Sequence, residues 1–391
     1  MKNNIKYPIA SSTWGCEEIS AINKVTESGF ITMGENVSKF EKDFSIYIGS
    51  KYSVMVNSGS SANLLMVASL FYYKNSNLKP GDEVIVPSTS WATTYYPLQQ
   101  YGLHVHFVDI DLETLNYDLH KLSKAVSDKT RVIMAVNLLG NPNDFNAIEG
   151  IIGDKNIILI EDNCESLGAE LSNKKAGTFG LMGTFSTYFS HHISTVEGGI
   201  ITTDSEELYQ ILLSLRSHGW TRNLPFSNLL TGKKSDNDFY ESFKFVLPGY
   251  NVRPLEYSGA IGIEQLKKLP DMILQRRKNA ALWVEEMSKY PFLKIQKEVG
   301  KSSWFGFSVI VMDNKKYSRD IIVSKLSNQG YDIRPIVAGN FVKNPVIKYF
   351  TSYEHGGLSC SDFVDRNGFF IGNQHYNIKE AIMRFGDIFK E

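Results

Sequence analysis

The chain has 391 residues, of which 42% are hydrophobic and 12% are aromatic, and its formal net charge is -1. This length fits two domains with sizeable cores, and a nearly neutral chain has no bulk field that would attract nucleic acid or an anionic membrane surface. Apolar runs stay well short of the ~20 residues of a membrane helix, and the start MKNNIKYP lacks the apolar stretch of a secretory signal. We therefore expect neither nucleic acid nor a membrane as a partner.

The three cysteines, Cys16, Cys164 and Cys360, lie far apart in the sequence. They form no Cys-x-x-Cys pair and are one short of the four that usually hold an iron–sulfur cluster. His104 and His106 stand two apart in an apolar segment without a third ligand nearby, so we interpret them as structural. We expect no metal, no iron–sulfur cluster and a reducing cytoplasm as the location.

In chain order, an N-terminal arm and a helix within 1–33 precede a second amphipathic helix at 36–49. The apolar strand 54–56 then enters the small-residue turn Asn57–Ala62, which contains Gly59, Ser60 and Ser61 and leads into an apolar helix at 63–73. Such a turn presents free backbone N–H groups beside a helix dipole, which suits a phosphate. An ordinary tight turn is the alternative interpretation, and the residues alone leave both open.

Short apolar segments continue to alternate with helical patterns up to about residue 247. This order predicts an α/β fold with a mainly parallel sheet and helices on both faces. Trp91 follows one predicted strand and could cover a flat ring or pack in the core. Asp162 ends another, where it could pair with a protonated ring nitrogen or cap a helix. The predicted strands are 83–87, 105–109, 131–137, 157–162, 183–186 and 199–203.

A polar, turn-rich segment at 223–238 is expected to be a mobile loop near the site. Helices are then predicted at 257–266 and 270–290, separated at Pro270, and from about residue 291 the pattern changes to a small mixed domain. We divide the chain into a large domain, 1–250, with an N-terminal arm, and a small C-terminal domain, 251–391, with connecting helices. Within the latter we expect a strand at 303–311, a helix at 318–329 and a short strand at 332–336.

The segment Gly183–Gly199, GTFSTYFSHHISTVEGG, combines a predicted strand carrying Ser186, two adjacent histidines and a Glu-Gly-Gly turn. It resembles the cofactor loop of fold-type I enzymes that depend on pyridoxal phosphate (PLP), in the sugar aminotransferase family named after DegT and StrS. The resemblance extends over essentially the whole chain. It implies an aspartate aminotransferase-like fold, with a large mainly parallel-sheet domain and a smaller C-terminal α/β domain.

In that family, a lysine six residues before the Glu of Glu-Gly-Gly holds PLP as a Schiff base, and His191 stands at this position. Imidazole has no primary amine, so the cofactor is not expected to be covalently attached. It can still move protons, with an ordinary pKa of about 6.5. The spacing to Glu197 selects His191 as the catalytic residue, and we interpret His192 as structural.

The resemblance assigns further residues to the cofactor. The phosphate would lie on the turn with Gly59, Ser60 and Ser61, together with Ser186. Trp91 would stack on the pyridine ring, Asp162 would pair with its nitrogen, and Glu165 would lie nearby. Asn251, in an Asn-x-Arg segment, would reach the phosphate of the partner subunit, which implies a homodimer with shared active sites.

The exchange of lysine for histidine resembles the sugar 3-dehydratase branch of this family. The segments SHH at 190–192, HGWTRNLP at 218–225 and LPGYNVRP at 247–254 match the branch of colitose and O-antigen biosynthesis. This implies a lyase using pyridoxamine phosphate (PMP) that removes the C3 hydroxyl of a nucleotide-linked 4-keto-6-deoxy sugar, with GDP favoured as the nucleotide. L-Glutamate would regenerate PMP and ammonia would be released. Candidate substrate-binding residues are His218, Arg222, Arg253 and Arg334.

Two other interpretations stay open at this point. One is an ordinary PLP-dependent nucleotide-sugar aminotransferase that uses a different lysine, and the other is a non-catalytic relative that binds PLP. A related branch acts on CDP-sugars and passes electrons from an iron–sulfur cluster, which the cysteine count disfavours.

Overall fold

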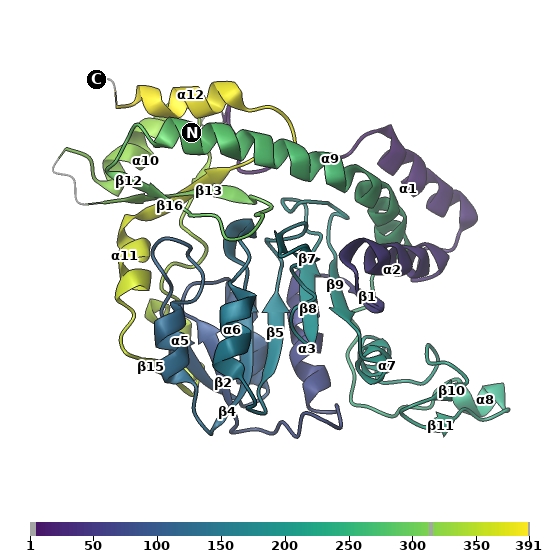
Figure 1. Ribbon diagram of the computed structural model, residues 1–391. Coiled ribbons are helices and arrows are strands. Elements are labelled where there is room, and N and C mark those ends of the chain that lie inside the picture. Colours follow the sequence, from purple (N-terminus) through teal and green to yellow (C-terminus); the bar gives the residue numbers. More distant parts are fainter. Residues whose placement is uncertain (1–4, 313–315, 390–391) are drawn as a thin grey trace.

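The computed structural model describes residues 5–312 and 316–389. A large sheet forms the lower body in Figure 1, and a smaller sheet lies above it, beneath a long helix. The eight strands of the large sheet are, in spatial order, β1 (Tyr52–Val56), β9 (Gly199–Thr203), β8 (Met182–Ser186), β5 (Ile158–Asp162), β4 (Thr130–Val136), β2 (Glu83–Pro87), β3 (His104–Val108) and β15 (Ser352–His355).

The large sheet is mainly parallel, as the sequence predicted. Strand β9 runs antiparallel to both of its neighbours, β1 and β8, and the pairs from β8 to β15 are parallel. The carboxyl ends of β1, β5 and β8 therefore meet at one edge of the sheet, where ligands bind in open α/β folds.

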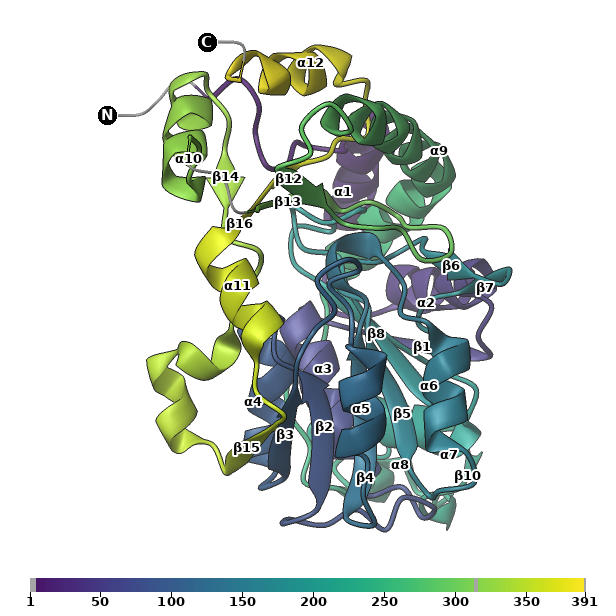
Figure 2. The ribbon, with the colours of Figure 1, turned by 60° about the vertical axis from the view of Figure 1, so that its left-hand side comes forward.

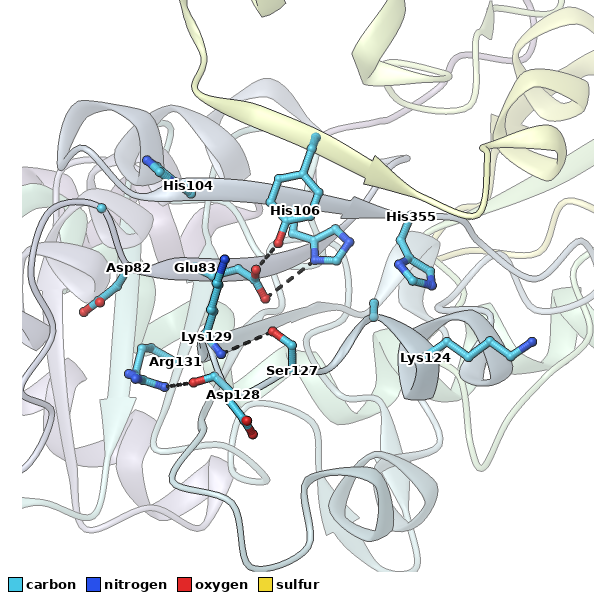
Figure 3. A pocket seen from close by; sticks show the side chains of 13 residues that line it. Asp82, Glu83, His104, His106, Lys124, Ser127, Asp128, Lys129, Arg131 and His355 are labelled. Carbon is cyan, nitrogen blue, oxygen red and sulfur yellow. Dashed lines mark hydrogen bonds and ion pairs between the residues drawn. The ribbon is translucent and has the colours of Figure 1, made fainter.

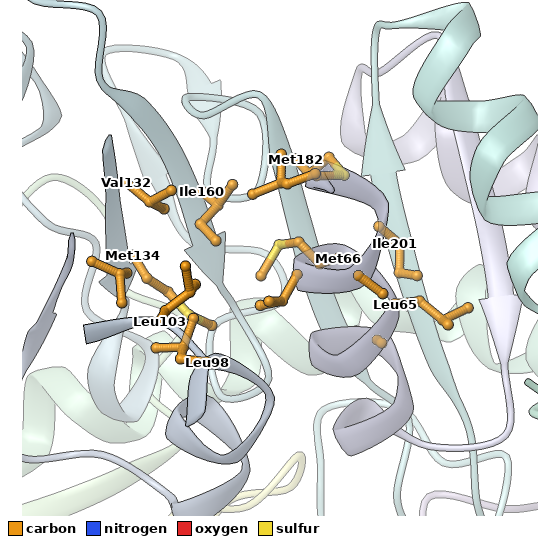
Figure 4. Packing of buried hydrophobic residues seen from close by; sticks show 14 of the residues in the cluster. Leu65, Met66, Leu98, Leu103, Val132, Met134, Ile160, Met182 and Ile201 are labelled. Atoms are coloured by element: carbon orange, nitrogen blue, oxygen red, sulfur yellow. The ribbon is translucent and has the colours of Figure 1, made fainter. Parts of the chain in front are cut away.

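Helices cover both faces of this sheet because its strands alternate apolar side chains to either side. Val84 and Val86 of β2 belong to the core beneath one set of helices, whereas Ile85 between them belongs to the opposite core. Figure 4 shows residues of this first core, with Leu65 of α3 beside Ile201 of β9, and Leu98 of α4 on the side of Met134 of β4. That face carries α3 (Gly59–Leu70), α4 (Ala92–Gln100) and α7 (Glu206–Leu215), and the other carries α5 (Leu119–Ala125) and α6 (Phe145–Ile152).

A third core joins the sheet to helices from both ends of the chain. Phe40 and Phe44 of α2 (Glu35–Ile48) pack with Phe185 of β8 and with Leu269 of α9 (Glu256–Met287). Helix α1 (Cys16–Ser28) also lies against α9. These contacts form a buried hydrophobic core against one side of the segment that carries Ser186 and His191.

The prediction of two separate helices around Pro270 was wrong, because α9 is continuous from Glu256 to Met287 with Pro270 inside it. Proline lacks the N–H that would bond the carbonyl of Leu266, which normally weakens a helix interior. Leu266, Leu269, Met272 and Ile273 are buried on both sides of this position. Their packing holds one helical axis through the defect.

The small sheet is antiparallel and contains β12 (Leu293–Ile295), β13 (Gly306–Val311), β16 (Gly368–Gly372) and β14 (Ile333–Arg334) in that order. It is accompanied by α10 (Arg319–Asn328), α11 (Ser359–Asn367) and α12 (Lys379–Asp387). Figure 2 shows the chain returning from this body to place β15 beside β3 of the large sheet. The proposed division at residues 250 and 251 therefore separates the chain just before α9, while β15 belongs to the large sheet.

The segment expected to be a polar loop near the site contains short elements, β10 (Ser227–Asn228), β11 (Gly232–Lys233) and the start of α8 (Asp238–Glu241), and projects from the body next to α7 (Figure 1). Another small hairpin is formed by β6 (Glu170–Leu171) and β7 (Lys174–Lys175), and the short 3-10 turns are Leu138–Gly140, Phe341–Lys343 and Pro345–Tyr349. Among the described residues, none of the helices combines the length and apolar character needed to cross a membrane.

Candidate active site

The turn before α3 has the geometry of an anion site. Ser58 caps the helix by accepting a hydrogen bond from the Ser61 N–H at 3.0 Å, and the helix begins at Gly59. A Cβ on Gly59 would lie 2.6 Å from the Cβ of Ser186, so the backbone of this turn approaches the end of β8 closely. The structure thus brings Gly59, Ser60, Ser61 and Ser186 together beside the positive end of a helix dipole.

Asp162 and Trp91 lie on neighbouring elements. Asp162 is the last residue of β5 and is buried, whereas the side chain of Trp91, immediately before α4, is 60% exposed. The two are linked by Thr94, whose N–H bonds the Trp91 carbonyl and whose hydroxyl bonds Asp162. An exposed aromatic ring and a buried carboxylate linked in this way suit a flat, partly cationic ring that stacks on one residue and pairs with the other. The residues therefore fit the phosphate, ring and ring nitrogen of PLP or PMP.

Two side chains that hold Asp162 were not predicted from the sequence. The Asn63 Nδ2 and the Thr94 Oγ1 each donate to Oδ2 of Asp162 at 2.8 Å. Both are buried residues of helices, and the available signal was a lone amide in the apolar run of α3.

His191 is held in one tautomer by the backbone. Its Nδ1 lies 2.6 Å from the carbonyl oxygen of Cys164, which can only accept, so Nδ1 carries the proton and Nε2 has the free lone pair. Burial lowers the pKa of His191 to about 4, and this outweighs the Cys164 carbonyl and Asp162, which act in the opposite direction. The ring is accordingly neutral at pH 7 and able to accept a proton at Nε2.

His192 is placed differently. It is buried, and its Nε2 lies 3.3 Å from the Ser303 carbonyl oxygen in the segment that leads into the small sheet. Burial also holds the pKa of His192 well below its ordinary value. The neighbouring histidines are thus anchored to different parts of the molecule, His191 to the end of β5 and His192 to the segment before β13.

Glu165 lies three residues after the end of β5, against the 3-10 turn Leu138–Gly140. Its Oε2 accepts a hydrogen bond from the Leu139 N–H at 2.9 Å, and burial raises its pKa to about 7, with a further contribution from the charge of Asp162. A carboxyl group with such a pKa can be protonated or ionised near neutral pH.

Three of the four candidate substrate residues gather around Trp220. The guanidinium of Arg222 lies 4.3 Å and that of Arg253 5.4 Å from the Trp220 ring centroid, and the exposed His218 lies edge-on at 5.3 Å. Asn251 joins this group because its Oδ1 accepts from the Arg253 Nε at 3.0 Å. Arg334 lies apart on β14 of the small sheet, where it pairs with Asp332.

A cavity of about 740 Å³ lies elsewhere, at the amino ends of β2, β3 and β4. Figure 3 shows His106 beneath β15, facing Glu83, while His104 points away from it. The His106 ring stacks on Tyr353 at 4.0 Å between centroids, which accounts for it as a packing residue. Within residues 5–312 and 316–389, there is no group of three or more histidine, cysteine or acidic side chains that could hold a metal ion.

Comparison with known proteins agrees with this geometry. The profile of the DegT/DnrJ/EryC1/StrS aminotransferase family matches residues 13–367. The chain is 58% identical to GDP-4-keto-6-deoxy-D-mannose 3-dehydratase of Yersinia pseudotuberculosis over 388 residues, 99% of each chain. It is 57% identical over 387 residues to the enzyme of the same name from Escherichia coli O55:H7, covering 99% of this chain and 100% of the relative.

Solved structures show the same likeness. A mutant GDP-4-keto-6-deoxymannose-3-dehydratase with bound GDP-perosamine superposes with a TM-score of 0.97 at 56% identity, covering 98% of this chain and 100% of that one. A structure of that enzyme with a trapped PLP-glutamate geminal diamine gives the same values. These matches cover both sheets, so they concern the whole fold and not one motif.

Proposed function

We propose that this chain, which belongs to the DegT/DnrJ/EryC1/StrS aminotransferase family, is a PMP-dependent 3-dehydratase of GDP-4-keto-6-deoxy-D-mannose. The observation that carries the proposal is His191 at the position where the family resemblance places a lysine, with a neutral imidazole held by the carbonyl of Cys164, two residues after Asp162. The relatives at 57–58% identity bear the name of this activity. Glutamate is proposed as the amino donor because a structural relative holds a PLP-glutamate adduct.

Each residue of the site would have its own role in holding the cofactor. The turn at Gly59–Ser61 and Ser186 would hold the phosphate, Trp91 would cover the ring, and Asp162 would pair with the ring nitrogen. Bound PMP supplies an amine that condenses with the C4 ketone and a ring that accepts electron density when its C4′ carbon loses a proton.

His191 would perform the proton transfers. Its Nε2 is unprotonated, so it can remove the proton from C4′ as a general base. The imidazolium formed can then protonate the C3 hydroxyl as that group leaves. Because imidazole cannot capture PLP as a lysine does, the cofactor would be free to act in its amine form.

Residues around Trp220 are proposed to contact the substrate and the partner subunit. His218, Arg222 and Arg253 are proposed to bind the anionic nucleotide-sugar, while the pairing of Arg334 with Asp332 gives that residue less support. Asn251 is exposed, and we propose that it completes the phosphate site of the partner in a homodimer with shared sites. A cytoplasmic location is proposed from the separated cysteines alone.

The test is to incubate the enzyme with PMP, L-glutamate and GDP-4-keto-6-deoxymannose and to identify the sugar product. We expect the 3-deoxy sugar together with 2-oxoglutarate and ammonia. Formation of the 4-amino sugar would identify an aminotransferase, and binding of PLP without any product would identify a non-catalytic relative. Either result would contradict the proposal.

A further inference from the structure

The carboxylate of Asp162 is held asymmetrically. Oδ2 accepts hydrogen bonds from Asn63 Nδ2 and Thr94 Oγ1, both at 2.8 Å, whereas Oδ1 accepts from the Cys164 N–H at 3.1 Å. Asn63 is 1% and Thr94 0% exposed. The two side-chain donors thus act on one oxygen and leave the other with a single backbone donor.

The donors are themselves fixed by further contacts. Oδ1 of Asn63 accepts from Thr184 Oγ1 at 2.6 Å, so its amide can present only the NH₂ group to Asp162. Thr94 lies 2.8 Å from Ser90 Oγ, and since its own proton goes to Asp162, it accepts from Ser90. Each donor is therefore oriented from behind and has a defined direction toward the carboxylate.

These donors stand on the helices that carry the other proposed cofactor contacts. Asn63 lies one helical turn after Ser60 on α3, and Thr94 lies three residues after Trp91, in the first turn of α4. The two helices are joined directly by the hydrogen bond from Ser60 Oγ to Thr93 Oγ1 at 3.1 Å. The phosphate turn, the stacking residue and the carboxylate are thus connected in one hydrogen-bonded unit.

We propose that Asn63 and Thr94 are positioning residues that hold Oδ2 of Asp162 and thereby present Oδ1 to the ring nitrogen of the cofactor. The carboxyl torsion of an aspartate has a broad minimum, so its plane is set by hydrogen-bond partners. Without the two donors, the carboxylate could turn away while the phosphate turn stayed intact. This inference rests on the proposed role of Asp162 in the function above.

The test compares binding of PMP with that of 1-deaza-PMP, in which carbon replaces the ring nitrogen, so that the ratio of dissociation constants reports the nitrogen contact alone. Wild type should prefer PMP. Thr94→Val, which removes only the hydroxyl donor, and Asn63→Leu, which removes the amide, should each reduce this preference about 3- to 10-fold, the size of one hydrogen bond. Thr94→Ser keeps a hydroxyl and should retain the wild-type ratio.

Chemical unfolding of the apo proteins shows which variants are folded. Asn63→Leu removes a donor on α3 and the Thr94 variants change a donor on α4, so each position tests the inference even if the variant at the other position does not fold. If folded Thr94→Val and Asn63→Leu keep the wild-type ratio while wild type produces the 3-deoxy sugar, the inference is wrong and the proposed function stands. If wild type shows no preference for PMP, Asp162 does not meet the ring nitrogen and the inference is also wrong. If wild type forms an amino sugar, the proposed dehydration fails whatever the binding ratio.

Discussion

At the scale of single residues, the proposed chemistry depends on the free nitrogen of one imidazole. His191→Asn keeps a polar side chain but has no titratable nitrogen, so proton transfer should fail while PMP still binds. General acid–base groups typically contribute about 10²- to 10⁴-fold, and we expect a loss of at least this size in the single-turnover rate of C3–O cleavage. The matched His192→Asn variant should lose much less, because His192 contacts the Ser303 carbonyl.

The same pair of variants can contradict the assignment. Near-normal cleavage by His191→Asn together with collapse in His192→Asn would show that the wrong histidine was selected. Loss of PMP binding in His191→Asn would instead show that this residue holds the cofactor.

Glu165 should make the free energy of unfolding of the apo protein fall as the pH rises. Burial raises its pKa to about 7, so the folded chain keeps a proton that the unfolded chain releases near pH 4.3. Stability from this group is present below about pH 4.3 and is lost as the pH rises through about 7. Glu165→Gln cannot ionise, so urea unfolding should show wild type losing more stability than this variant between pH 5 and pH 8.

His191 contributes the opposite slope, because its lowered pKa favours folding as the pH rises above about 4. His191 is present in both proteins, so its contribution cancels when the unfolding free energy of Glu165→Gln is subtracted from that of wild type at each pH. Parallel pH profiles for the two proteins would contradict the raised pKa of Glu165.

At the scale of elements, α9 contains a removable defect. Pro270 is exposed inside the helix and cannot donate to the Leu266 carbonyl. Pro270→Ala supplies that N–H without opening a cavity. The substitution also raises the conformational entropy of the unfolded chain, which lowers the free energy of unfolding by about 0.4–1 kcal/mol. Because an interior proline costs about 3 kcal/mol, we expect the free energy of unfolding to rise by a net amount of about 2–2.6 kcal/mol in chemical unfolding. A destabilised variant would show that Leu266 has another donor or that the helix needs the proline.

The elements that sequence could predict are those with a strong local pattern. The central strands and α2 were found because alternating or helically spaced apolar residues such as Val37, Phe40 and Phe44 reflect the face they bury. The continuity of α9 was missed because packing on both sides of Pro270 is absent from the local pattern. β15 was not foreseen, since a short and largely polar strand is defined only by its pairing with β3.

Some residues of the candidate site could also be predicted from a local sequence pattern, and others could not. Gly59–Ser61, Asp162 and His191 stand at the ends of predicted elements, where their position along the chain indicates a shared edge. Asn63 and Thr94 were missed because their role depends on which helix faces the end of β5, and this is a tertiary property. The tautomer of His191 is set by a backbone carbonyl, which no side-chain motif can reveal.

At the scale of the whole molecule, the surface around Asn251 suggests that one chain does not complete its site. Asn251, His218 and Arg222 are exposed around Trp220, and the projecting segment beside them exposes Phe239, Tyr240 and Phe243. Large apolar side chains gathered next to cationic ones are typical of an interface. This supports the proposed homodimer, in which Asn251 of each subunit serves the other's phosphate site.

The shared site can be tested by mixing two inactive proteins. In a mixed dimer of His191→Asn and Asn251→Asp subunits, one site would combine both defects and the other would combine native His191 with native Asn251. Since random exchange makes half of the dimers mixed, a 1:1 mixture should recover about one quarter of wild-type dehydratase activity. If each site lies within one chain, every site keeps a defect and mixing restores nothing. Exchange of subunits is verified with differently tagged chains, so a mixture of proven mixed dimers without recovered activity would rule out the shared site.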